Sequence, residues 1–204
     1  NRKTNIIATY SNKSIIDKFN YLLSLGFSKI ETISITTICP QIYCYKQDSI
    51  KTKFDNLMSL GYTYEEVKIM IINYPAILNT SLEYIEFYNS IGLHNVLIKD
   101  TSHLITSLSL VYARYMFLKG KDVTIDEKSY RKLFMRSKQF QKKYNISSEE
   151  LINKYPYKTN KKRVPNSRIT KPVEETMSTK YYGMINYLVQ LGYKKEEAIK
   201  ILKK

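Results

Sequence analysis

The 204-residue chain has no tryptophan, only two cysteines, and six glycines that never adjoin one another. Isolated glycines exclude a glycine-rich phosphate loop, and the motifs of zinc peptidases and serine hydrolases are missing too. Paired glutamates such as Glu65 and Glu66 fall in the first turns of predicted helices, where acidic groups complement the helix dipole. No apolar run approaches the ~20 residues that cross a bilayer. We therefore expect a protein that is not an enzyme, needs no cofactor and binds no membrane.

The scarce metal-ligating side chains do not predict a metal site. Zinc needs four ligands, and Cys39 and Cys44 supply two at most. The only histidines, His94 and His103, fall in a different repeat of the sequence. We expect two thiols in a reducing compartment and no bound metal.

Acidic residues are few relative to basic ones. The chain has 33 Lys and Arg but only 18 Asp and Glu, which gives a net charge of +15. Residues 121–172 hold 15 basic and 5 acidic side chains, whereas residues 1–120 hold 12 and 9, and residues 173–204 hold 6 and 4. Two thirds of the excess thus lies in about a quarter of the chain. Uniform codon drift toward lysine would not produce that distribution, so we expect a localised basic surface.

A repeat of about 35 residues runs along the chain. Its first copy is FNYLLSLGFSKIETISITTICPQI and its second is FDNLMSLGYTYEEVKIMIINYPAI, each with 14 residues from glycine to proline. Three partial copies follow: one at Gly92 with Thr106 in the place of the proline, one with Asn145 in the place of the glycine, and one that begins at Gly192.

Each copy predicts two helices that are joined by a glycine turn and followed by a proline break. Apolar residues three and four positions apart precede the glycine, which takes the left-handed conformation that ends a helix. Ser28, Thr63 and Ser147, each followed three residues later by glutamate, predict capping boxes that begin the second helix. Since one pair cannot bury its apolar face alone, we expect an all-α solenoid of about five stacked units.

Leu-Gly-aromatic, Ser/Thr-x-x-Glu and Pro-x-Ile/Leu on this period resemble the repeat of the mitochondrial transcription termination factor (mTERF) family. The resemblance covers most of residues 19–204 and implies stacked helix–turn–helix repeats with short 3₁₀ turns in a curved superhelix. Residues 1–18 would then be an N-terminal cap or extension, and a basic loop at about 157–172 would interrupt the repeats. The family implies nucleic-acid binding in transcription, its termination or ribosome assembly, in a mitochondrial or other organellar matrix. A bacterial cytoplasm fits the composition equally well.

Two stretches without an acidic residue form the candidate nucleic-acid-binding site. KSYRKLFMRSKQFQKKY, residues 128–144, predicts a helix with Arg131, Lys138 and Lys142 aligned opposite an apolar stripe. YKTNKKRVPNSRITKP, residues 157–172, predicts an extended loop. Arg114 is added because LVYARYMFLKGK resembles a stretch of the family. The residues predicted to contact RNA or double-stranded DNA are Arg114, Arg131, Lys132, Arg136, Lys138, Lys142, Lys143, Lys158, Lys161, Lys162, Arg163 and Arg168.

Three alternatives remain open. A lysine-rich surface can be solvated and have no partner. A helical-repeat scaffold can bind a protein partner as a subunit of a larger complex, and the absence of nucleic-acid retention at low salt would favour it. A compact helix-turn-helix regulator is the third alternative. The clustering of four of the six arginines between Arg131 and Arg168 favours nucleic acid, because guanidinium suits bidentate contact with phosphate.

Overall fold

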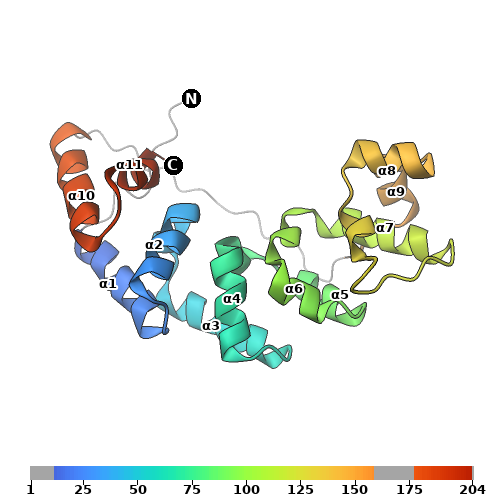
Figure 1. Cartoon of the computed structure of the whole chain (residues 1–204), viewed down its shortest axis with the longest axis horizontal. Coiled ribbons are helices and arrows are strands. Elements are labelled where there is room, and N and C mark those ends of the chain that lie inside the picture. The colour runs from blue at the N-terminus through green and yellow to red at the C-terminus, as the bar shows by residue number, and fades with distance from the viewer. Residues whose placement is uncertain (1–11, 159–176, 204) are drawn as a thin grey trace. The chain divides into compact units, whose positions relative to one another are not determined.

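The computed structural model describes residues 12–158 and 177–203, and within these ranges the regular elements are helices, with no strand (Figure 1). The predicted all-α fold is confirmed. The elements are α1 (Asn12–Ser24), α2 (Lys29–Ile38), η2 (Pro40–Cys44), α3 (Gln47–Ser59), α4 (Tyr64–Asn73), η3 (Pro75–Asn79), α5 (Leu82–Ser90), α6 (His94–Lys99), η4 (Thr101–Ile105), α7 (Leu108–Lys119), η5 (Tyr130–Phe134), α8 (Ser137–Tyr144), α9 (Ser148–Lys154), α10 (Met177–Leu191) and α11 (Lys195–Lys203), where η marks a 3₁₀ helix.

The chain divides into two compact units. Unit 1 comprises residues 1–58 and 166–204, and so combines the N-terminal helices with α10 and α11. Unit 2 comprises residues 59–165 and contains α4 to α9 in sequence order.

The turns between paired helices have the backbone that the sequence predicts. Gly26, Gly61, Gly92 and Gly192 have φ values of 74°, 95°, 77° and 106°, and Asn145 takes the same left-handed region at 52°. Residues other than glycine and asparagine rarely adopt this backbone region, so one of these two is needed where the first helix of each pair ends.

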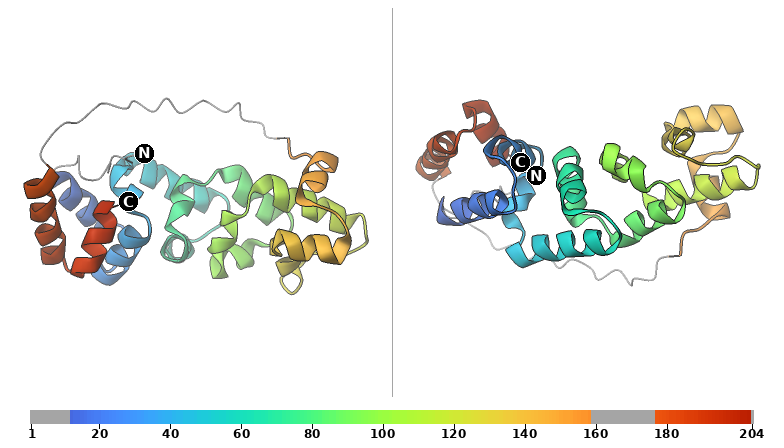
Figure 2. Two further views of the ribbon diagram at one scale, coloured as in Figure 1. Left: turned by 90° about the horizontal axis from the view of Figure 1, so that it is seen from above. Right: turned by 60° about the horizontal axis from the view of Figure 1, so that its bottom comes forward.

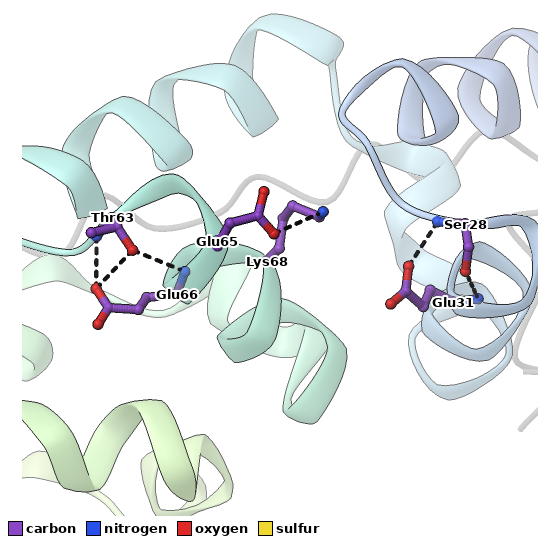
Figure 3. Close-up of polar contacts among 6 residues, drawn as sticks. All are labelled: Ser28, Glu31, Thr63, Glu65, Glu66 and Lys68. Carbon is purple, nitrogen blue, oxygen red and sulfur yellow. Dashed lines mark hydrogen bonds and ion pairs between the residues drawn. The ribbon is translucent and has the colours of Figure 1, made fainter.

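The predicted capping boxes are present (Figure 3). The backbone N–H of Ser28 donates to Oε2 of Glu31 over 2.7 Å, and the Glu31 N–H donates back to the Ser28 hydroxyl over 3.2 Å. Thr63 and Glu66 repeat the arrangement at 2.8 and 3.3 Å, and Ser147 opens α9 in the same way. The backbone bond from Thr63 lowers the pKa of Glu66.

Proline starts two of the described 3₁₀ helices, but η4 and η5 form without it. Pro40 and Pro75 are the first residues of η2 and η3. The prediction that Thr106 stands in the proline's place is wrong, because α6 ends at Lys99 and η4 begins two residues later. There the Asp100 carboxylate accepts a hydrogen bond from the Ser102 hydroxyl, a local turn that competes with helix continuation.

Residues 128–144 are not one helix, so the prediction of a single helical face is wrong. The segment divides into η5 and α8, with extended backbone at Met135 between them. The guanidinium of Arg114 binds the carbonyl oxygens of Leu133 and Met135, which a continuous helix would need for its own bonds. Residues 120–129, where a second helix would follow α7, form a loop closed by hydrogen bonds between Asp126 and Ser129.

Unit 1 is completed by the C-terminal helix pair. Figures 1 and 2 show α10 and α11 beside α1 and α2, and α11 contacts α2 directly. Buried side chains from both ends of the chain share one core, including Phe19 and Tyr43 with Leu188, Tyr193 and Ile201. The order of stacking in unit 1 therefore differs from the order of the sequence.

Candidate nucleic-acid interface

Arg114 of α7 is a buried structural cation in unit 2. Its side chain is 1% exposed, and one guanidinium nitrogen donates to the carbonyls of Leu133 at 2.8 Å and Met135 at 2.7 Å. The group lies over the ring of Phe140, 4.7 Å from its centroid, and reaches the Ser137 hydroxyl at 3.4 Å. Burial lowers the pKa of Arg114. A side chain so enclosed presents no surface to a phosphate, so it does not belong to the interface with the exposed cations.

Helix α8 separates an aromatic face from a cationic one. Phe140 is buried and its ring lies 4.5 Å from that of Tyr144, which also packs edge-on against Phe117. Lys138 and Lys142 are one helical turn apart and both are exposed. They lie about 200° around the helix from Phe140 and Tyr144, as expected for residues offset by two positions. The aromatic packing therefore fixes the direction in which these lysines project.

The cations that precede α8 extend this surface toward η5. Arg131 and Arg136 are exposed, Lys132 is half-buried, and the Arg131 guanidinium lies 5.8 Å from the centroid of the Tyr130 ring. Arg136 occupies the N-cap position of α8 and makes no side-chain capping bond there. We call the set formed by Arg131, Lys132, Arg136, Lys138, Lys142 and Lys143 the η5–α8 surface. Within residues 12–158 and 177–203, none of its members forms an ion pair.

The start of α8 differs electrostatically from the starts of α4 and α9. Those helices carry glutamates in their first turns, and capping boxes occupy their free N–H groups. Helix α8 has no acidic residue in its first turn and no side-chain cap. The positive end of its dipole therefore adds to the charge of Arg136 and Lys138.

The structure covers the predicted basic loop only in part. Lys158 is exposed and is the last residue described before the gap in the structure. The remaining predicted contacts, Lys161, Lys162, Arg163 and Arg168, lie outside the described residues.

An aromatic cluster leads up to this loop. Tyr157 packs edge-on against Tyr112 of α7, with ring centroids 5.1 Å apart, and against Phe87 of α5 at 6.4 Å. Partial burial, followed by the charges of Glu83 and Glu86, raises the pKa of Tyr157. The cluster thus holds the chain immediately before Lys158, but its acidic neighbours do not suit a phosphate.

A metal site and a membrane-spanning helix are not present in the described ranges. They contain no group of three or more His, Cys, Asp or Glu side chains that could hold a metal ion. Cys39 is buried and Cys44 is half-buried, and the two do not form a disulfide. None of the described helices is long and apolar enough to cross a membrane.

Residues 2–92 match the mTERF family. Proteins of the mTERF family are non-catalytic, bind nucleic acid and are typically organellar, and the predicted resemblance to this family is confirmed over residues 2–92. No curated protein and no solved structure matches the chain. The mTERF match ends well before the η5–α8 surface, so the assignment of that surface depends on its charge and geometry.

Proposed function

We propose that this mTERF-domain chain acts in organellar gene expression by binding the phosphate backbone of RNA or DNA through the η5–α8 surface. The observation that carries the proposal is a set of six cations within residues 131–143 that form no ion pair among the described residues. Phosphates would supply the missing negative charge. Contacts of this kind position a nucleic acid and carry no sequence information directly.

The start of α8 offers phosphate oxygens more than side-chain charge. The first N–H groups of a helix have no acceptor within it, and here no side chain caps them. Anions bind at such ends because backbone donors and the helix dipole act together. Arg136 and Lys138 flank the donors, which makes this end of α8 the proposed centre of the interface.

The proposal also includes the basic loop predicted from the sequence at about 157–172. Lys158 is exposed where the described chain stops, and the sequence continues with further cations and no acidic residue up to Pro172. The loop would extend the same backbone contact along the nucleic acid.

Salt dependence tests the interface. The triple variant Arg136→Gln, Lys138→Gln, Lys142→Gln should lower the steepness of log K against log salt for duplex DNA by about 2.7, since each lost phosphate contact is worth about 0.9. Fluorescence anisotropy with a DNA duplex and an RNA hairpin measures the slope for both ligands. Circular dichroism checks that helicity is unchanged.

A matched control removes three exposed lysines elsewhere, in Lys46→Gln, Lys51→Gln, Lys195→Gln. This control has the same net charge as the test variant, so it separates a local interface from a general charge effect. An equal decrease of the slope in both variants contradicts the proposed location. A wild-type chain that binds neither ligand at low salt contradicts nucleic-acid binding and favours the protein scaffold.

A further inference from the structure

The C-terminal helix pair contacts the first repeat as one repeat contacts the next. In unit 1, Phe27 packs edge-on against Phe54, with centroids 6.3 Å apart. Phe27 directly follows a turn glycine, and Phe54 stands seven residues before the next one. Tyr193 and Phe19 occupy the corresponding positions and make the corresponding edge-on contact at 6.1 Å. The pair α10–α11 therefore takes the place of a repeat that precedes α1–α2.

A buried chain of hydroxyl groups makes this contact specific. The Thr36 hydroxyl donates to the Thr32 carbonyl over 2.7 Å, so it accepts from Tyr193, whose oxygen lies 2.5 Å away. Tyr193 in turn accepts from the Tyr43 hydroxyl at 2.7 Å. Hydrogen bonds in such a series strengthen one another, and each has directional requirements. A helix pair that fits this face must therefore place a tyrosine where α10–α11 places Tyr193.

Both halves of the interface are carried by a single chain but are separated in sequence. The 107 residues of unit 2, 59–165, stand between α3 and the segment that contains α10. A contact between two distant parts of one chain can form with the same atoms between two chains, which makes exchange of an element a low-cost route to a dimer.

We propose that the face of α1 and α2 also docks the α10–α11 pair of a second copy, so that the chain forms a dimer by reciprocal exchange of these helices. The partner is fixed by chemistry: it must bring the apolar residues Leu188 and Ile201 together with the Tyr193 hydroxyl. The proposal is independent of the nucleic-acid interface, and its test needs no nucleic acid.

Complementation between two damaged chains tests the exchange. Leu188→Asp places a charge on the α10 side of the core, and Phe19→Asp places one on the α1 side, so each variant breaks its own interface. The two variants refolded together should form a species of twice the 24.0 kDa monomer mass, because one intact face and one intact helix pair remain. Size-exclusion chromatography with light scattering measures the mass.

A control mixture combines Leu188→Asp with Ile185→Asp, both on the α10 side. No intact α10–α11 pair is then available, and the mixture should stay monomeric. A monomeric mixture of Leu188→Asp with Phe19→Asp would overturn the proposal where circular dichroism shows that both variants are helical.

The wild-type chain decides the question if the variants do not fold. Unlabelled and ¹⁵N-labelled wild-type chains refolded together at high concentration should give mixed dimers in native mass spectrometry. Monomers alone at every concentration would overturn the proposal.

Discussion

Each unit contains a pair of buried tyrosines, and the two pairs differ in their hydrogen bonds. In unit 1 the hydroxyls of Tyr43 and Tyr193 are bonded to each other, across 150 positions of sequence. In unit 2, Tyr84 and Tyr88 are also buried, yet their hydroxyls have no partner among the described residues, and burial raises the pKa of Tyr88. Unit 1 closes on a distant segment and uses directional bonds to select it. Unit 2 stacks neighbours in sequence, and there the buried Tyr62 hydroxyl donates to the side chain of Asn89, only 27 positions away.

Each unit also contains a buried cation that donates a hydrogen bond at the end of a 3₁₀ helix. Lys18 of α1 is 6% exposed and donates to the carbonyl of Tyr45, the residue that follows η2. Arg114 of α7 does the same for Met135, which follows η5. Basic residues thus serve two separate purposes in this chain, and burial distinguishes the structural cations from those of the η5–α8 surface.

The largest predicted effect comes from removing the cation of unit 2. Arg114→Leu removes the donor to the buried carbonyl of Leu133 and to the part-buried carbonyl of Met135, at about 1–3 kcal/mol each, so the free energy of unfolding should decrease by about 3 kcal/mol. Urea denaturation measures the change. Hydrogen exchange should show lost protection in α8 and retained protection in α2.

The matched control for this variant is Arg136→Leu, which removes an exposed arginine of the same unit and should change stability by less than about 0.5 kcal/mol. Equal destabilisation by the two variants would show that the bonds of Arg114 to the carbonyls contribute little.

Removing one hydroxyl from each unit should have opposite results. Tyr193→Phe deletes two hydrogen bonds and should lower the free energy of unfolding by about 1–2 kcal/mol. Tyr88→Phe deletes a hydroxyl without a partner and should leave stability unchanged or raise it by up to about 1 kcal/mol. Thermal denaturation compares the two variants directly. A loss at Tyr88 as large as that at Tyr193 would remove the proposed difference between these two buried hydroxyls.

The smallest effect contrasts capped and uncapped helices within unit 2. Arg136→Ser gives α8 the N-cap that Ser147 gives α9, and should raise stability by about 0.5–1 kcal/mol. The same change removes one phosphate contact and should lower the salt slope of duplex binding by about 0.9. Increased stability combined with unchanged binding would place the centre of the interface away from the start of α8.

Local signals in the sequence were sufficient to predict the helix pairs. Gly61, Thr63 and Glu66 act on backbone within a few residues, so their meaning does not depend on the rest of the fold. Two local features were not predicted, namely the turn at Asp100, which takes the place of a proline break, and the loop at 120–129, which takes the place of a second helix. Neither contains the repeat's proline or glycine pattern.

The remaining differences between the predicted and the observed structure arise from tertiary contacts. Arg114 resembles any surface arginine in sequence, and only its bonds to η5 and the residue after it show that it is buried. The division of residues 128–144 into η5 and α8 follows from the same bonds. The pairing of Tyr193 with Tyr43 depends on packing between opposite ends of the chain, which repeat periodicity does not specify.

Unit 1 is built from two separate segments of the chain, so its parts are synthesised at different times. A ribosome delivers α1 to α3 first and α10 to α11 last, whereas the contiguous residues of unit 2 can fold during translation. Until the final helices emerge, Ile15 and Phe19 lack the side chains that cover them in the finished protein. Helices α1 to α3 are therefore synthesised before unit 2 but acquire their complete core after it, and they are a part that a chaperone would need to shield.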